Sequence, residues 1–105
     1  MANVIPNAFK GELLSGTHNF ASGGNSFKLA LYTSNPYDTS STAYSTTNEV
    51  SASGGSNYTT TGLVLQNQSV TTGATSFVDF DDLTFSSATF SAAFGAIYND
   101  TNSDK

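Results

Sequence analysis

The sequence predicts a mainly β fold: a small antiparallel β-sandwich or open barrel with one short N-terminal helix. Three observations favour this class. Apolar and polar residues alternate in several short stretches, glycine pairs and polar breaks separate those stretches, and phenylalanine (8) and tyrosine (5) are prominent. A chain of 105 residues fits one β-rich domain, residues 1–105, with a single modest core.

Residues 6–16 are predicted to form the helix. Pro6 suits a first helical turn, Phe9 and Leu13 are four residues apart as on one helical face, and Gly16 is a typical stop. A strand is the competing interpretation, because apolar residues also alternate in this segment.

Residues 27–33 are predicted to form a half-buried strand. Phe27, Leu29 and Leu31 would lie on one face, with Tyr32 on the opposite face. The Ser-Asn-Pro sequence that follows ends the strand, because proline cannot donate a ladder hydrogen bond.

Residues 37–62 form a long polar excursion of mostly Ser, Thr, Asn, Gly and Tyr. Glu49 and Val50 are among its few anchors, and Gly54-Gly55 predicts a turn. So long a loop is unusual inside a compact domain, so we expect an irregular segment with a function of its own.

Residues 63–99 are predicted to be the strand-rich half. It holds four candidate strands, at residues 63–70, 76–80, 83–90 and 92–98. The last has the clearest alternation, with one face made of Phe90, Ala92, Phe94, Ala96 and Tyr98. Large and small residues alternate on this face, which favours packing in the core. An exposed aromatic platform for carbohydrate is the alternative.

The composition excludes several classes of function. The chain has no cysteine or tryptophan, one histidine, three lysines and a net charge of −5. Three scattered lysines cannot neutralise a row of phosphates or hold an anionic membrane, so neither nucleic acid nor a membrane is an expected partner. The lack of cysteine excludes disulfides and thiolate metal sites. The first residues lack the features of a signal peptide, which predicts synthesis in a cytoplasm.

His18 is the only histidine and therefore the first candidate for a general base. Ser15 is near in sequence, but a catalytic triad is defined by geometry in space, and no nucleophile-elbow motif is present. A lone histidine of this kind is more often a structural hydrogen-bonding residue. The sequence predicts that the protein is not an enzyme.

Asp79, Asp81 and Asp82 form the densest acidic group. The favoured interpretation is a solvated edge that discourages strand aggregation. A Ca²⁺ site is the alternative, because Ca²⁺ prefers carboxylate oxygens. Residues 100–104 match only the opening of a calcium loop, and a polar tail explains them equally well. We therefore expect no cofactor, with Ca²⁺ as the alternative.

Several segments resemble a family of small virion structural proteins of tailed bacteriophages. They are residues 9–14 (FKGELL), 18–20 (HNF), 27–33 (FKLALYT), 43–44 (AY), 47–50 (TNEV), 85–88 (FSSA) and 96–100 (AIYND). The resemblance implies a non-enzymatic capsid decoration or cement protein located in the virion and made in the host cytoplasm. It also implies that the partners are the major capsid protein or other virion proteins, and that the protein is a homo-oligomer.

Members of that family continue with further β-strands beyond the position of Lys105. The resemblance therefore leaves two readings, a shorter variant or a chain that lacks C-terminal strands. In the second, residues 90–98 would keep an open strand edge that a neighbouring subunit could cover.

Four tyrosines are the predicted anchors of an interface, because rigid aromatic side chains tend to dominate interface energies. They are Tyr32, Tyr37, Tyr44 and Tyr58. We expect residues 37–62 to make the intersubunit contacts. The alternative function is a glycan-binding module of a phage tail fibre or adhesin, which would use exposed aromatic rings and the three aspartates with Ca²⁺.

Overall fold

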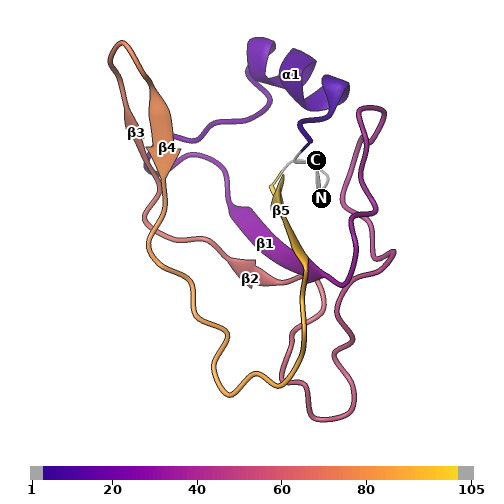
Figure 1. The fold of residues 1–105 in the computed structure, drawn as a ribbon. Helices are drawn as coiled ribbons and strands as arrows, with labels where there is room; N and C mark the ends of the chain where they lie inside the picture. The colour runs from indigo at the N-terminus through magenta and orange to yellow at the C-terminus, as the bar shows by residue number, and fades with distance from the viewer. Residues whose placement is uncertain (1–3, 102–105) are drawn as a thin grey trace.

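The computed structural model describes residues 4–101. It contains one helix and five strands: α1 (Asn7–Leu14), β1 (Phe27–Tyr32), β2 (Leu63–Val64), β3 (Ser69–Thr71), β4 (Phe77–Asp79) and β5 (Phe94–Asn99). All strand pairs are antiparallel. The predicted class, mainly β with one short N-terminal helix, is confirmed (Figure 1). Over the described range, no helix is long and apolar enough to cross a membrane.

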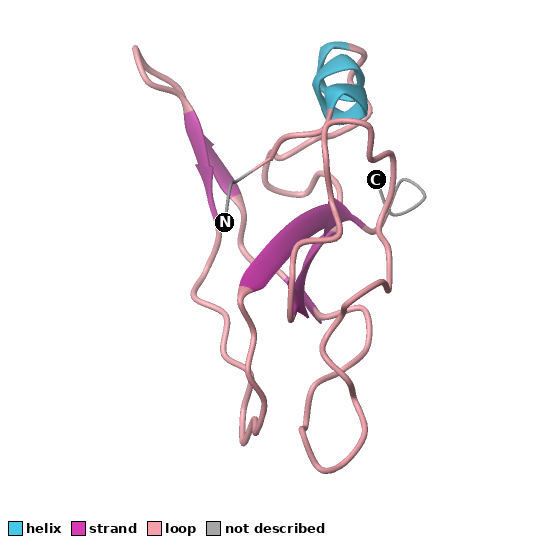
Figure 2. Ribbon diagram, turned by 45° about the vertical axis from the view of Figure 1, so that its right-hand side comes forward, coloured by secondary structure: helices cyan, strands magenta, loops and turns pink. Residues whose placement is uncertain are grey.

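The central element is a three-stranded sheet in the order β2-β1-β5. Strands β1 and β5 pair along their whole length, from Phe27 opposite Asn99 to Tyr32 opposite Phe94. The short β2 pairs only with Lys28 and Leu29. Figure 2 shows the helix at one end of this sheet and long loops at the other.

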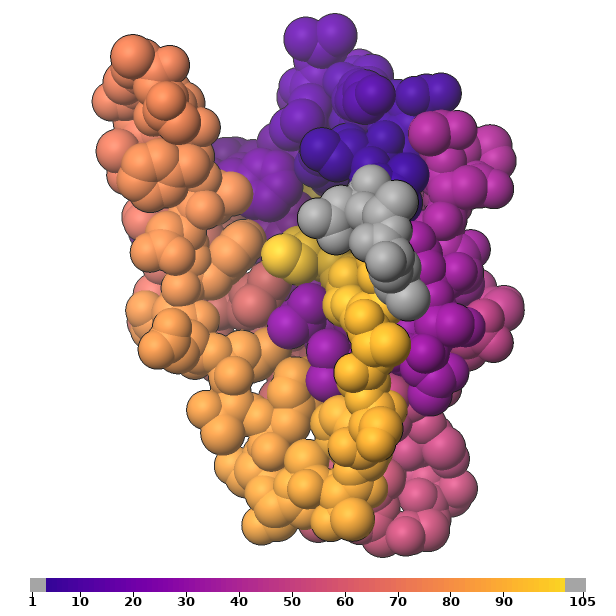
Figure 3. Space-filling view, in the orientation of Figure 1, coloured from indigo at the N-terminus to yellow at the C-terminus, as the bar shows by residue number. Residues whose placement is uncertain are grey.

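Strands β3 and β4 form a separate two-stranded ribbon that projects from the body (orange in Figures 1 and 3). Its base is held by the ring of Phe80, which lies 6.2 Å from that of Phe27. The radius of gyration is 14.3 Å, somewhat above the roughly 13 Å expected for a compact chain of this length. The projecting ribbon is consistent with this excess.

The helix predicted at residues 6–16 is confirmed as α1. It ends where Gly16 takes a positive φ of 78°, and the Ser15 hydroxyl donates to the Gly11 carbonyl. A stack of rings joins the helix to the sheet, because Phe9 packs on Phe20 and Phe20 lies parallel to Phe27 at 4.2 Å.

The strand predicted at residues 27–33 is confirmed as β1, but the prediction that it is half-buried needs correction. Ala30 and Tyr32 are buried on one face, where they form the core with Tyr98. Phe27 is buried on the other face, beneath Phe20 and Phe80. Loops cover both faces of this strand, which alternation alone does not reveal.

Three strand predictions in the second half need correction. Residues 63–70 form two short strands, because Asn67 takes a positive φ of 54° and turns the chain. Residues 83–90 form no strand, since Ser87 has a positive φ of 54° and the Ser87 carbonyl accepts a hydrogen bond from Asn57. The strand predicted at 92–98 begins two residues later, at Phe94.

The remaining strand prediction, residues 76–80, is confirmed as β4. The long excursion at residues 37–62 is irregular, as expected, and Gly54 and Gly55 both take positive φ at its predicted turn. One isolated bridge between Tyr32 and Glu49 attaches the excursion to the sheet.

Candidate interaction site

The Glu49 carboxylate connects separate parts of the long loop by hydrogen bonds. Its Oε1 atom accepts a hydrogen bond from the Tyr44 hydroxyl. Its Oε2 atom accepts from the Tyr58 hydroxyl at 2.5 Å and from the Thr61 N–H at 2.9 Å. Hydrogen bonds to an ionised acceptor are stronger than neutral ones, so Glu49 holds three points of the loop together. We call these four residues the Glu49 clamp.

The Tyr58 hydroxyl extends the clamp to the sheet. It accepts a hydrogen bond from the Leu31 N–H at 3.0 Å. Leu31 lies beyond the part of β1 that pairs with β2. Next to it, the Val50 N–H donates to the Leu31 carbonyl, and the Thr33 N–H donates to the Asn48 carbonyl, both at 2.9 Å. Strand β2 and then the loop therefore satisfy this edge of β1 along its whole length.

A second pair of hydroxyls lies deeper in the same region. The Tyr32 hydroxyl lies 2.6 Å from that of Tyr37 and donates to the Ser45 carbonyl at 2.9 Å. The Tyr98 ring stacks on Tyr44 at 4.6 Å, and its hydroxyl donates to the Thr61 carbonyl at 2.7 Å. Every fully buried side-chain nitrogen or oxygen within residues 4–101 has a hydrogen-bond partner.

Burial changes the acid–base behaviour of this network. It is the main cause that raises the pKa of Tyr32, Tyr44 and Tyr58 above the usual value. Hydrogen bonds to the negative Glu49 raise the pKa of Tyr44 and Tyr58 further. These hydroxyls therefore stay protonated and act as donors at neutral pH.

Two of the four predicted interface tyrosines are core residues, which corrects that prediction. Tyr32 is 0% exposed and Tyr58 is 3% exposed, so neither ring can anchor a partner at the surface. Phe85 and Phe90 cover the Tyr58 ring. Tyr37 and Tyr44 are partly exposed, and their proposed role at an interface stays a prediction.

His18 lies in a second polar network, between the helix and β5. Its Nδ1 atom lies 3.0 Å from Asn99 Nδ2, and its Nε2 atom lies 3.1 Å from Glu12 Oε1. Because the Asn99 amide nitrogen can only donate, Nδ1 accepts and Nε2 carries the proton toward Glu12. The Ser15 hydroxyl is bound to the Gly11 carbonyl instead. This geometry matches the structural role predicted for His18.

The proposed calcium ligands do not form a metal site. Asp81 accepts a hydrogen bond from Asn67 at 2.6 Å, Asp79 accepts from the Phe80 N–H, and all three aspartates are exposed. Within the described part of the chain, no three His, Cys, Asp or Glu side chains could together hold a metal ion. The structure therefore does not bring Asp79, Asp81 and Asp82 together as the Ca²⁺ alternative requires. Residues 102–104 of the other calcium candidate lie outside the described residues.

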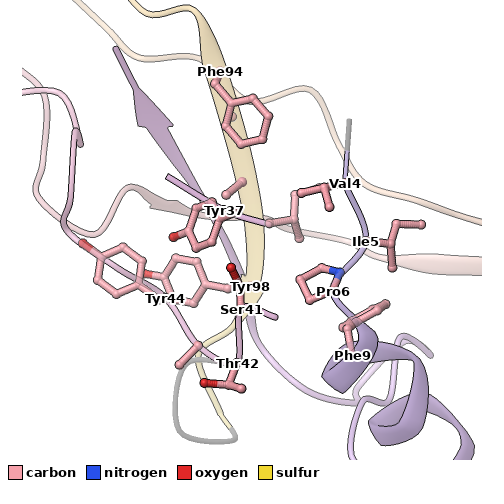
Figure 4. A pocket seen from close by; sticks show the side chains of 14 residues that line it. Val4, Ile5, Pro6, Phe9, Tyr37, Ser41, Thr42, Tyr44, Phe94 and Tyr98 are labelled. Carbon is pink, nitrogen blue, oxygen red and sulfur yellow. The ribbon is translucent and has the colours of Figure 1, made fainter. Parts of the chain in front are cut away.

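An apolar groove of about 340 Å³ runs beside β5. Figure 4 shows Val4, Ile5 and Pro6 on one side of the strand and Tyr37 and Tyr44 on the other. Its lining contains no charged residue and consists of Val4, Ile5, Pro6, Phe9, Tyr37, Ser41, Thr42, Ala43, Tyr44 and residues 94–98. The hydroxyls of Tyr37, Tyr44 and Tyr98 are bound elsewhere, so these residues contribute mainly ring surface. The groove therefore suits an uncharged, largely apolar occupant.

The turn that ends the long loop restricts which side chains can be accommodated there. Thr61 and Gly62 have positive φ values of 79° and 82°, a conformation that β-branched residues rarely adopt. At Gly62 a Cβ atom would overlap the carbonyl oxygen of Leu29. This close approach lets the chain pass directly from the clamp into β2.

Three features were not predicted from the sequence: the Glu49 clamp, the hydrogen bond from the Leu31 N–H to the Tyr58 hydroxyl, and the buried Asn99. One signal was available for the clamp: Glu49 is the only glutamate in a stretch that contains three tyrosines. Comparison of the chain with protein-family models, curated proteins and solved structures found no match.

Proposed function

We propose that this protein is a non-enzymatic structural component of a phage particle, a decoration or cement protein that binds the assembled capsid. The phage assignment rests on the sequence resemblance described above. The mode of action, attachment through a preformed surface, rests on the groove and on the clamped loop beside it.

The residues that carry the resemblance meet in the fold, which supports using them as a signature of architecture. Glu12, His18 and Asn99 form one hydrogen-bonded chain between the helix and β5. Tyr44 and Glu49 belong to the clamp. These segments form the framework of the fold, so the choice of partner would depend on the surface residues around them.

The observation that carries the proposal is the uncharged apolar groove along β5. The centres of protein–protein interfaces are depleted in charge and enriched in aromatic residues, and the groove has both properties. Its tyrosine wall belongs to a loop that hydrogen bonds hold in place, so little conformational entropy is lost on binding. Many copies on a symmetric shell would add weak individual contacts into a stable attachment.

Quantitative mass spectrometry of purified virions tests the assignment. Hundreds of copies per particle are expected for a decoration protein, whereas a handful would indicate the tail or neck. Absence of the protein from the particle would contradict the proposal.

A matched pair of variants tests the role of the groove. Ile5 lines the groove and is 58% exposed, whereas the exposed Leu14 lies on the helix outside it. Ile5→Lys should lower capsid occupancy at least tenfold, because a charge in an apolar contact costs about 1.4 kcal/mol or more. Leu14→Lys should leave occupancy unchanged. Equal occupancy for both variants would exclude the groove as the attachment surface.

The glycan-binding alternative is not favoured by a specific observation. Its Ca²⁺ ligands are not assembled, and the tyrosine hydroxyls beside the groove are already bound within the protein. Binding to a glycan array in the presence of a chelator would restore that alternative.

A further inference from the structure

The amide side chains beside His18 form a hydrogen-bonded chain whose direction is fixed at both ends. The Asn99 Oδ1 atom accepts a hydrogen bond from the Thr101 N–H at 3.0 Å. The Asn25 Oδ1 atom accepts one from the Asn19 N–H at 2.7 Å. Because a backbone N–H can only donate, these two bonds identify the oxygen atom of each amide. The Asn99 Nδ2 atom therefore donates to Asn25 Oδ1 at 3.1 Å and to His18 Nδ1 at 3.0 Å.

The His18 side chain is fully buried, and both of its ring nitrogens have partners. On the helix side, Nε2 lies 3.1 Å from Glu12 Oε1, and the centre of the Phe9 ring lies 4.7 Å from that of the imidazole. On the side of β5, the contact is the uncharged amide of Asn99. Asp100, the next residue after β5, forms its ion pair elsewhere. Among the described contacts, Glu12 is therefore the charged group that faces the ring.

A second proton on His18 conflicts with the fixed direction of this chain. A protonated imidazole donates from both nitrogens, so Nδ1–H would point at the Asn99 amide nitrogen, which also donates. Turning the Asn99 amide over would offer its oxygen to Nδ1, but it would bring Nδ2 against the Thr101 N–H and the oxygen against Asn25 Oδ1. The bond from Nε2 to Glu12 is possible in both states, and the positive charge strengthens it. Protonation therefore disturbs the β5 side of the ring and keeps the helix side.

The contacts that depend on the Asn99 amide join the end of β5 to the start of β1. The Thr101 hydroxyl accepts a hydrogen bond from the Ser26 N–H at 2.8 Å, and the Asp100 N–H donates to the Ser26 carbonyl at 2.9 Å. Thr101 is held in this position by the bond from its own N–H to Asn99. Loss of that bond therefore weakens the attachment of residues 100–101 to Ser26, which directly precedes β1.

We propose that His18 is a pH-sensitive switch between α1 and β5. In its neutral form it completes the amide chain that holds residues 99–101 against Ser26. In its protonated form it keeps its bond to Glu12 on the helix and releases Asn99, so residues 99–101 separate from Ser26. Histidine is the side chain whose charge ordinarily changes near neutral pH, which suits it to this role. The switch does not depend on the capsid assignment.

NMR of the wild type between about pH 8 and about pH 4, a range that spans the ordinary titration of histidine, tests the switch. The ring nitrogen shifts of neutral His18 should report a proton on Nε2 and none on Nδ1. As His18 takes up its second proton, the Ser26 and Thr101 amides should lose protection against hydrogen exchange at least about tenfold, relative to the intrinsic rate at each pH. The Leu31 amide, which is bound to the Tyr58 hydroxyl, should stay protected, and this separates local release from global unfolding.

Two variants assign the pH dependence to His18. His18→Gln removes the titrating group, so the protection of Ser26 and Thr101 should no longer change across that pH range. Asp100→Asn removes the neighbouring carboxylate and leaves the amide chain in place, so it should behave like wild type.

The wild-type titration decides the matter even if His18→Gln does not fold. A neutral His18 that carries its proton on Nδ1, or Ser26 and Thr101 amides that stay protected after His18 is charged, would each overturn the proposal. So would a pH dependence that survives in His18→Gln, or a wild type that unfolds before His18 takes up its second proton.

Discussion

The backbone groups along β1 and β5 that face away from the β1–β5 pairing differ in how their hydrogen bonds are satisfied. On one side, β2 covers only the first part of β1, and the Tyr58 hydroxyl with the backbone of Asn48 and Val50 satisfies the rest. On the other side, β5 leaves Gly95 and Ile97 without a described partner. A polar loop can therefore close a strand edge without forming a strand. Within residues 4–101, no loop plays this role for Gly95 and Ile97.

The largest expected effect comes from Gly62→Ala, which breaks the closed side. The new Cβ would overlap the Leu29 carbonyl oxygen, and the residue would also hold an unfavourable positive φ. We expect a loss of about 4 kcal/mol in the free energy of unfolding, measured by urea denaturation.

Gly54→Ala is the matched control, because Gly54 also has a positive φ but open space around its Cβ position. It should cost only about 1 kcal/mol, the conformational part of the penalty. Equal losses for the two variants would show that the close approach at Gly62 is not important.

The second largest effect is expected from Glu49→Ala, which removes the shared acceptor of the clamp. The hydroxyls of Tyr44 and Tyr58 and the Thr61 N–H all lose a partner at once. The free energy of unfolding should fall by about 3 kcal/mol. Asp38→Ala, at an exposed carboxylate that bonds only within its own turn, should cost less than about 1 kcal/mol. A loss at Glu49 no larger than that at Asp38 would exclude the clamp as a source of stability.

Tyr58→Phe should have a smaller effect, because it removes one hydroxyl and keeps the buried ring. The Leu31 N–H would lose its acceptor, which should cost about 1.5 kcal/mol. In a double-mutant cycle with Glu49→Ala, the two losses should add to more than the loss in the double variant, since both remove the same hydrogen bond. Strict additivity would mean that the two residues do not act together.

The last prediction concerns the tyrosine hydroxyls, whose ionisation should leave the stability unchanged at neutral pH and lower it at high pH. Tyr32, Tyr44 and Tyr58 have raised pKa values in the folded protein. Above the unfolded pKa of about 10 the folded state therefore holds more protons than the unfolded chain, and stability falls as the pH rises. Urea midpoints should be constant from about pH 8 to 9.5 and decrease above about pH 10, less steeply in Tyr58→Phe. An equally steep decrease in that variant would place the effect outside the clamp.

The sequence was a good guide to elements with a regular pattern and a poor guide to irregular contacts. Period-two alternation correctly located β1 and β4, and the proline and glycine signals correctly located α1. It failed at residues 83–90, where apolar spacing suggested a strand but Phe85 and Phe90 pack on a tyrosine of the loop. Hydrophobic periodicity cannot distinguish a ring that faces a sheet from one that covers a loop.

The candidate site was predictable in composition and not in geometry. The tyrosines of the long loop were predicted to anchor an interface, but Tyr58 faces inward because its hydroxyl can serve both Leu31 and Glu49. These partners lie 27 and 9 residues away in sequence. A contact of that kind follows from the folded path of the loop and has no local signature.

Native-state hydrogen exchange at two amides tests the contrast between the two edges most directly. At a concentration where the protein is monomeric, the Leu31 amide should be protected nearly to the level of global unfolding, and the Ile97 amide should exchange at close to the rate of an open backbone group. Equal protection of the two amides in the monomer would mean that the β5 edge is covered within one chain, and it would contradict the account.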